Sequence, residues 1–199
     1  MTSRPALRQD LRQQRRALSP AEHRQRAEQL ARQFSVTRLF RASRHIACYI
    51  ANDGEIDPLA LMQRAWALGK TCYLPVLHGI RPQRLWFAAY RPGDDLVYNR
   101  FGIAEPNSPR REWVHARCLD IICTPLVAFD AQGNRIGMGG GFYDRTLAFM
   151  QRRRSWRRPH MIGLAYEFQK VDIIAHRPWD VPLQAVVTEQ RVYRQHEML

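Results

Sequence analysis

This chain of 199 residues lacks long apolar runs and an apolar leader. No window approaches the roughly 18 consecutive apolar residues that a transmembrane helix needs. The first residues, MTSRPALRQDLRQQRRALS, are charged from the start and have no apolar central region, so they do not resemble a secretory signal. These absences argue against a membrane-spanning or secreted protein, and we expect the protein to be cytoplasmic.

Cysteine is also scarce. The four cysteines, Cys48, Cys72, Cys118 and Cys123, form no Cys-x-x-Cys pair, and no histidine cluster has the spacing of a zinc site. Three of them lie in apolar runs and are expected to be small, reduced core side chains. The sequence therefore argues against a disulfide scaffold and against a zinc ribbon.

Lysine is rare beside arginine, and the chain carries a formal net charge of +13. A basic excess of this size favours anionic partners, which include nucleic acid, a nucleoside triphosphate and a polycarboxylate ligand. Charge alone does not choose among them. No RNA-recognition aromatic motif, zinc finger or helix-turn-helix pattern is visible, so nucleic acid is the less favoured partner.

Apolar periodicity and helix signals divide the chain into helices and strands. A stripe through Leu7, Leu11, Arg15 and Leu18 indicates a first helix, and Ser19-Pro20-Ala21-Glu22 is typical of the capping box of a second. The predicted helices cover the first forty residues in two segments, then residues 57–69 and 142–151, and the predicted strands cover residues 45–50, 72–76, 84–90, 119–123, 161–165 and 185–188.

Strands that alternate with helices favour an α/β protein with a mostly parallel sheet that is covered on both faces. We therefore predict a single three-layer α/β/α domain over residues 1–199, with a helical segment at its N-terminal end. No internal repeat and no long low-complexity linker divides the chain.

Gly137 and the run Gly139 to Gly141 place four glycines within five residues, after a predicted strand and before a predicted helix. Glycine lets a ligand approach the backbone closely, and successive amides at a helix N-terminus bind anions. The loop is not a Walker loop, because no Gly-Lys-Ser/Thr closes it. It is not GxGxxG, because Phe142 takes the place of the last glycine. Taken alone, the glycines fit a flexible turn equally well.

The residues that flank the glycines favour a nucleotide site over a turn. The Arg135 guanidinium can bond two phosphate oxygens, and the Asp144 carboxylate is a hard ligand for magnesium. Phe142 and Tyr143 supply ring faces for a heterocycle. A phosphate cradle, a cation, a carboxylate and aromatic rings lie within ten residues of one another. This combination suits ATP and magnesium together.

The run from Phe129 to Arg145, FDAQGNRIGMGGGFYDR, resembles the signature of the 5-formyltetrahydrofolate cyclo-ligase family, whose members are also called methenyltetrahydrofolate synthetases. Other segments resemble elements of the family in the same order, namely residues 4–8, 52–56, 101–106 and 182–189. The glycine segment is specific, and the other elements are weak one by one. Together they extend the resemblance over nearly the whole chain.

The resemblance implies an enzyme that uses ATP and magnesium to convert 5-formyltetrahydrofolate to 5,10-methenyltetrahydrofolate, with release of ADP and phosphate. It implies ATP binding at Arg4, Pro5, Ala6, Leu7, Arg8, Arg135, Ile136, Gly137, Met138, Gly139, Gly140, Gly141, Phe142 and Tyr143. It implies folate contacts at Ile50, Glu55, Met138, Gly139, Gly140, Gly141 and Phe142. By the same resemblance, Asp144 and Asp180 hold magnesium, and Arg135 stabilises charge on the transferred phosphate.

The chain departs from the family pattern at three positions. Gln184 stands where relatives often have Asp, and Met138 and Gly140 occupy loop positions where a basic residue can occur. Three alternatives therefore stay open: a family member without activity, an enzyme of the same scaffold with another substrate, and a basic nucleic-acid-binding protein. The basic run 151–158 is expected to be a solvated surface first, and a contact for a polyglutamate tail of the folate second. We expect a monomer.

Overall fold

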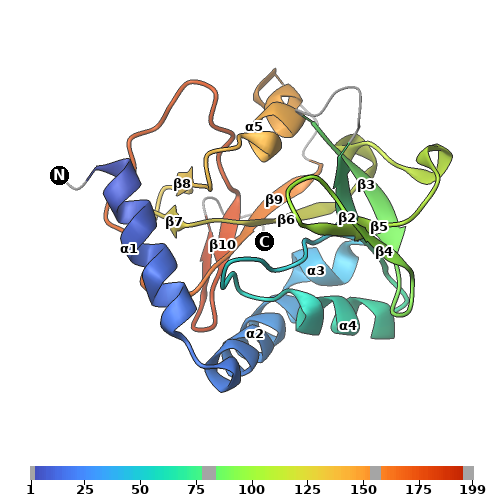
Figure 1. The fold of residues 1–199 in the computed structure, drawn as a ribbon, viewed down its shortest axis with the longest axis horizontal. Coiled ribbons are helices and arrows are strands. Elements are labelled where there is room, and N and C mark those ends of the chain that lie inside the picture. Colours follow the sequence, from blue (N-terminus) through green and yellow to red (C-terminus); the bar gives the residue numbers. More distant parts are fainter. Residues whose placement is uncertain (1–2, 78–83, 153–157, 195–199) are drawn as a thin grey trace.

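The computed structural model describes residues 3–77, 84–152 and 158–194. A seven-stranded sheet with the order β11-β10-β9-β6-β1-β2-β3 forms its centre. The strands are β1 (His45–Ala47), β2 (Thr71–Leu77), β3 (Leu85–Tyr90), β6 (Ile121–Pro125), β9 (His160–Leu164), β10 (Ala185–Val187) and β11 (Val192–Arg194) (Figure 1). The five inner strands are parallel, and the edge strands β3 and β11 are antiparallel to their neighbours. The predicted α/β fold with a mostly parallel sheet is confirmed.

Helices cover one face of this sheet. They are α2 (Pro20–Ser35), α3 (Arg38–Ala42) and α4 (Leu59–Ala67), which lie together at the bottom of Figure 1. Leu30 of α2 and Leu61 of α4 are buried against strand side chains such as Ile46 and Leu74. Burial of each such side chain contributes roughly 1.5–3 kcal/mol to stability. The cluster of buried side chains on this face is larger than the cluster on the opposite face.

The opposite face is covered by the short helix α5 (Phe142–Leu147), the 3-10 turns η2 (Ala116–Cys118) and η3 (Ala148–Arg152), and irregular chain. Leu147 and Leu119 are buried there against Ile122, Met161 and Val186. These strand residues alternate with those that point to the first face. The second outer layer is thus present but thin, because loops rather than long helices fill most of it.

The N-terminal helix α1 (Arg4–Ala17) packs on a two-stranded hairpin formed by β7 (Ala128–Phe129) and β8 (Arg135–Ile136). Leu11 of α1 lies with Ala128 and Ile136 in a separate small core. Ser3 caps the helix by accepting a hydrogen bond from the Ala6 N–H. Because β8 leads directly into the glycine segment, α1 is held beside that segment.

The predicted strand at residues 45–50 is too long. β1 ends at Ala47, although the Cys48 N–H still donates to the Tyr73 carbonyl over 2.9 Å, and the Tyr49 hydroxyl then donates to the Ile56 carbonyl over 2.8 Å. Elements that the sequence did not predict include α3, β11, the β7–β8 hairpin and a hairpin of β4 (Leu96–Tyr98) and β5 (Ala104–Pro106) within the turn-rich stretch. Each of them is short, so its periodic signal is weak.

The predicted helix at residues 142–151 is also too long, since α5 ends at Leu147 and continues as η3. The Thr146 hydroxyl donates to the Phe142 carbonyl over 2.6 Å and accepts from the Leu85 N–H over 2.8 Å. A threonine bonded to the carbonyl four residues earlier competes with regular helix geometry. No helix in the described ranges has the length and apolar character of a membrane span.

The chain leaves the neighbouring strands β1 and β6 toward opposite faces of the sheet. After β1 it forms α4 on one face, and after β6 it forms the β7–β8 hairpin and α5 on the other side. In open parallel sheets, ligands bind in the crevice at the carboxyl ends of strands where the order reverses in this way. The segments 48–56 and 126–144, which follow these strands, therefore mark the candidate site.

Candidate functional site

A cavity of about 790 Å³ lies over the carboxyl ends of β1, β2 and β6, which is the size of a small-molecule site. Most of the predicted site residues line it: Arg4, Arg8, Ile50, Glu55, Arg135, Ile136, Gly137, Met138, Gly139, Gly140, Gly141, Phe142, Tyr143, Asp144 and Asp180. Pro5, Ala6 and Leu7 are not part of the lining, and Leu7 packs against the small core under α1. The fold thus brings segments from both ends of the chain to one cavity.

The glycine segment forms one wall of this cavity. Gly139, with φ 101°, and Gly141, with φ 63°, adopt left-handed conformations that side chains disfavour. Gly141 is also the N-cap residue of α5. Met138, Gly139 and Gly140 are exposed and line the cavity, so their backbone is accessible to a ligand.

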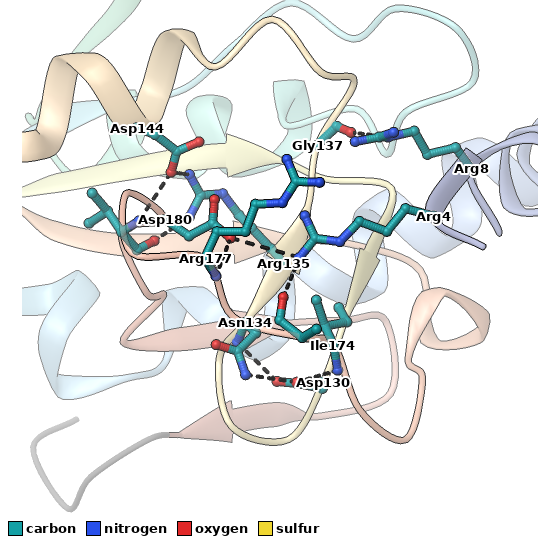
Figure 2. A network of polar contacts seen from close by, with 12 residues as sticks. Arg4, Arg8, Asp130, Asn134, Arg135, Gly137, Asp144, Ile174, Arg177 and Asp180 are labelled. Carbon is teal, nitrogen blue, oxygen red and sulfur yellow. Dashed lines mark hydrogen bonds and ion pairs between the residues drawn. The ribbon is translucent and has the colours of Figure 1, made fainter. Parts of the chain in front are cut away.

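The fully buried carboxylate of Asp130 holds the turn that precedes the glycines. One oxygen accepts from the backbone N–H groups of Gln132 and Asn134, at 3.0 and 2.9 Å. The other accepts from the Asn134 side chain and the Ile174 N–H, both at 2.9 Å (Figure 2). Four donors therefore satisfy this charge and tie the hairpin to the segment that leads to Asp180.

The Arg135 guanidinium is buried and bonded to other groups of the protein. It donates to the Asp144 carboxylate over 2.6 Å and to the Val181 carbonyl (Figure 2). The Val181 N–H donates to the same Asp144 oxygen over 3.1 Å. Arg135 thus holds Asp144 at the cavity that it also lines, and its expected contact with phosphate stays a prediction.

Arg4, Arg8 and Arg177 lie close together at the cavity beside the glycine segment (Figure 2). The Arg8 side chain donates to the Gly137 carbonyl over 2.9 Å, and Arg4 lies 3.9 Å from the Asp180 carboxylate. Burial and the charges of Arg4 and Arg177 lower the pKa of Arg8. Like charges that repel one another in this way favour an anionic ligand between them.

Glu55 reaches the cavity from the segment that follows β1, next to Tyr49 and Ile50. Desolvation raises the pKa of Glu55 to about 7, although a hydrogen bond from the Asn52 N–H at 3.2 Å and the charge of Arg15 oppose the rise. The carboxyl therefore changes its charge near neutral pH. In its ionised form it can accept hydrogen bonds from paired N–H donors of a ligand.

Aromatic side chains line the cavity between these groups. Phe142 of α5 meets Phe101 edge to face, with ring centroids 5.7 Å apart. Burial raises the pKa of the Tyr143 hydroxyl, so this residue is neutral at physiological pH. Aromatic faces next to polar groups suit a flat heterocyclic ligand.

Asp144 of α5 and Asp180, near β10, both line the cavity. Among the residues that the structure describes, no group of three or more His, Cys, Asp or Glu side chains is arranged to hold a metal. Magnesium is commonly bound by one or two carboxylates, with waters and substrate phosphates completing the octahedron. The donor set therefore fits magnesium that arrives with a nucleotide, and it does not fit a self-contained metal centre.

The sequence did not assign a role to several residues of the cavity. The β4–β5 hairpin brings Asn99, Phe101 and Glu105 to it. The Glu105 carboxylate accepts from the Asn99 side chain over 2.7 Å and from the Leu77 N–H over 3.0 Å, which ties the hairpin to β2. The resemblance of residues 101–106 to a family element was the available signal for these residues, but it did not indicate that they lie at the cavity.

Arg177 and Trp179 are further unassigned lining residues, and their nearness to Asp180 in sequence was the only signal for them. Gln184, the departure from the family pattern, does not line the cavity. Its side-chain oxygen accepts from the Met161 N–H over 2.8 Å and so extends the pairing of β9 with β10. Of the basic run 151–158, residues 153–157 lie outside the described residues, so the structure gives no account of the expected tail contact.

Comparison with known proteins gives consistent matches. A model of the 5-formyltetrahydrofolate cyclo-ligase family matches residues 1–189. The 5-formyltetrahydrofolate cyclo-ligase of Escherichia coli K12 is 39% identical over 183 residues, covering 92% of this chain and 98% of the relative. That of Haemophilus influenzae Rd is 42% identical, covering 90% and 94%. The NMR structure of Aquifex aeolicus 5,10-methenyltetrahydrofolate synthetase has a TM-score of 0.81 at 29% identity, covering 98% and 94%.

Asp130→Asn should lower the free energy of unfolding by about 1.5–3 kcal/mol, because the new amide NH₂ must face donors that the carboxylate satisfied. Urea denaturation measures the change. Asp172→Asn, at an exposed position two residues before Ile174, is the matched control and should change stability by no more than about 0.5 kcal/mol. Equal stability of Asp130→Asn and wild type would contradict the role given to this carboxylate.

Proposed function

The chain belongs to the 5-formyltetrahydrofolate cyclo-ligase family, and from this premise we propose that it converts 5-formyltetrahydrofolate to 5,10-methenyltetrahydrofolate with consumption of ATP. One observation carries the proposal. A single cavity is lined by the glycine wall (residues 137–141), by Arg4, Arg8 and Arg177, and by the desolvated carboxyl of Glu55. The glycines and arginines suit a polyphosphate, and a carboxylate suits the paired N–H donors of a pterin. The enzyme is a ligase of one-carbon metabolism.

The reaction needs ATP because a formamide oxygen is a poor leaving group. The formyl oxygen on N5 of the folate attacks the γ-phosphate, and ADP departs. N10 then attacks the activated carbon, its proton is lost, and phosphate leaves as the ring closes. Phosphoryl transfer of this kind depends mainly on positioning and on stabilisation of charge. We therefore assign no covalent nucleophile to this chain.

Fixed cations and amides supply the charge stabilisation in this proposal. Arg4 and Arg8 are in place beside the glycine wall through their bonds to the protein, so little reorganisation is needed when a phosphate arrives. The backbone of Gly139 and Gly140 offers further donors from the exposed part of the loop. On the folate side, Phe101 and Phe142 offer faces to the pterin, and Glu55 accepts from its edge.

Asp144 and Asp180 are the residues that would hold magnesium. Within the described part of the chain, the recorded contacts of Asp144 go to one carboxylate oxygen, which leaves the other available to a cation. Magnesium bound there supplies neutralisation of charge on the phosphate oxygens. The contribution of Arg135 is to hold the Asp144 carboxylate in place through the hydrogen bond at 2.6 Å.

The finer expectations from the sequence stay predictions. They are a cytoplasmic location, a monomeric state and, as the second reading of the basic run 151–158, a contact for a polyglutamate tail of the folate. The alternative of a nucleic-acid-binding protein is not favoured, because the family match spans residues 1–189 and part of the basic excess lines the cavity.

The proposed activity is tested by mixing the protein with ATP, magnesium and 5-formyltetrahydrofolate. The methenyl product absorbs in the near ultraviolet, where the substrate does not, so its formation is followed directly. We expect product with all three components, and none when either ATP or magnesium is omitted. A purified, folded protein that forms no product would refute the proposed function.

Arg135→Ala should reduce kcat by about a hundredfold, the scale of losing one oriented electrostatic group. The variant removes the donor at 2.6 Å from Asp144 and leaves the weaker bond from the Val181 N–H to hold that carboxylate. Arg111→Ala, at an exposed position outside the cavity lining, is the control and should keep wild-type turnover. Near wild-type kcat in Arg135→Ala would rule out the role given to this residue.

The rate at low folate concentration should depend on the ionisation of Glu55. Because its pKa is raised to about 7 by burial, kcat/KM for the folate should fall about tenfold for each pH unit below that value. Glu55→Gln should lower kcat/KM and abolish this acid limb, whereas Glu112→Gln, at an exposed 3-10 turn, should keep it. An unchanged acid limb in Glu55→Gln would assign the titration to another group.

A further inference from the structure

Asp53 is a charged residue that lines the cavity, and neither the sequence nor the reaction assigns a role to it. It takes a positive φ of 53°, which is unusual for a residue other than glycine. Its carboxylate receives three guanidinium groups from α1: Arg12 at 2.6 Å, Arg15 at 2.9 Å, and Arg16. A single carboxylate thus binds the C-terminal half of α1 to the segment that carries Glu55.

Arg15 is the central member of this cluster. Its side chain is fully buried, and it donates to Asp53 and to the Leu126 carbonyl, the latter over 3.3 Å. Its Nε is buried and has no hydrogen-bond partner among the described residues. A Cβ built on Gly54 would lie 3.2 Å from Arg15 backbone atoms, so the helix and the Asp53 turn are in close contact. A buried guanidinium needs its counter-charge in place.

The two segments that Asp53 connects, α1 and the turn before Glu55, each reach the cavity. The N-terminal turns of α1 carry Arg4 and Arg8, which meet the glycine wall. The turn beyond Asp53 is closed by Glu55, whose N–H donates to the Asn52 carbonyl over 3.0 Å and whose carboxylate accepts from the Asn52 N–H over 3.2 Å. Movement of the Asp53 turn would therefore displace Glu55 relative to the arginines of α1.

We propose that Asp53 and Arg15 form a positioning pair that holds the folate-side carboxylate of Glu55 in a fixed relation to the nucleotide-side helix α1. The inference rests on the proposed function, because it assigns Glu55 to the folate and α1 to ATP. Arg15 is not part of the cavity lining and Asp53 is, and we assign both to the positioning of Glu55 and the arginines of α1.

The charges of the pair act on Glu55 in opposite directions. After desolvation, the positive charge of Arg15 lowers the pKa of Glu55 and the negative charge of Asp53 raises it. The other titratable groups that interact electrostatically with Glu55 are Tyr49 after β1 and Tyr143 of α5, and the pKa of each is raised by burial, so both are neutral. Removal of either member of the pair disrupts the same contact, yet the two removals should shift Glu55 oppositely.

The test compares Asp53→Asn, Arg15→Met and Arg15→Lys in the full-length enzyme. KM for each substrate, kcat, and the pH profile of kcat/KM for the folate are measured, with thermal melting as a check of folding. We expect Asp53→Asn and Arg15→Met to lower kcat/KM for the folate by on the order of tenfold to a hundredfold, the scale of a small misplacement. Arg32→Met, at an exposed site on α2, is the control and should match wild type.

The inference is decided by the acid limb of the pH profile of kcat/KM for the folate. It should move to lower pH in Asp53→Asn and to higher pH in Arg15→Met, and Arg15→Lys should return it toward the wild-type position. A shift in the same direction in both charge-removing variants, or no shift in either, would overturn the proposal even if both variants are slow. If Arg15→Met does not fold, the shift in Asp53→Asn together with the Arg15→Lys profile decides.

These outcomes are separate from a failure of the proposed function. If the wild-type enzyme neither binds nor converts the folate, both proposals fall together. If the wild type is active and its acid limb responds to Glu55→Gln but not to the pair, the proposed function stands and the positioning role is refuted.

Discussion

The divergence of the chain after β1 and β6 is the constraint on which the site depends. These neighbouring parallel strands end at the same edge of the sheet, and their following segments turn to opposite faces. The cavity lies in the crevice between them, as is usual where following segments diverge in this way. Every group with a role in the proposed chemistry reaches this crevice from a different part of the chain: α1, the turn after β1, the β4–β5 hairpin, the glycine wall and the segment around Asp180.

Buried arginine–carboxylate pairs fix those segments in place. Arg135 holds Asp144, and Arg15 holds Asp53, in each case with a buried guanidinium that also donates to a backbone carbonyl. Arginine suits this role better than lysine, because its planar fork bonds two partners at once and its charge persists when buried. The scarcity of lysine relative to arginine is consistent with that use. Many of the arginines are exposed, however, so this use accounts for only part of the excess.

The sequence correctly predicted the features that depend on local sequence patterns. The capping box at Ser19, the mostly parallel sheet and the glycine segment all follow from spacing and periodicity, and all are present. It did not predict that Phe101 would meet Phe142, since contact between residues so far apart is set by tertiary packing. Arg15 illustrates the same limit: it was placed in the stripe that indicates the first helix, but nothing local showed that it would be buried with Asp53 as its partner.

The arrangement of charge also explains why the site should respond to its ligand. Burial and, after it, the charges of Arg4 and Arg177 lower the pKa of Arg8, so the folded chain carries repulsion at this wall. A polyphosphate placed among them replaces that repulsion with attraction, and a ligand that binds the folded state alone stabilises it in proportion to the logarithm of its concentration. The carboxylates of Asp144 and Asp180 beside the same wall would repel that polyphosphate. Magnesium held by Asp144 and Asp180, as proposed, would offset this repulsion, which gives a physical reason to expect nucleotide and magnesium to bind together.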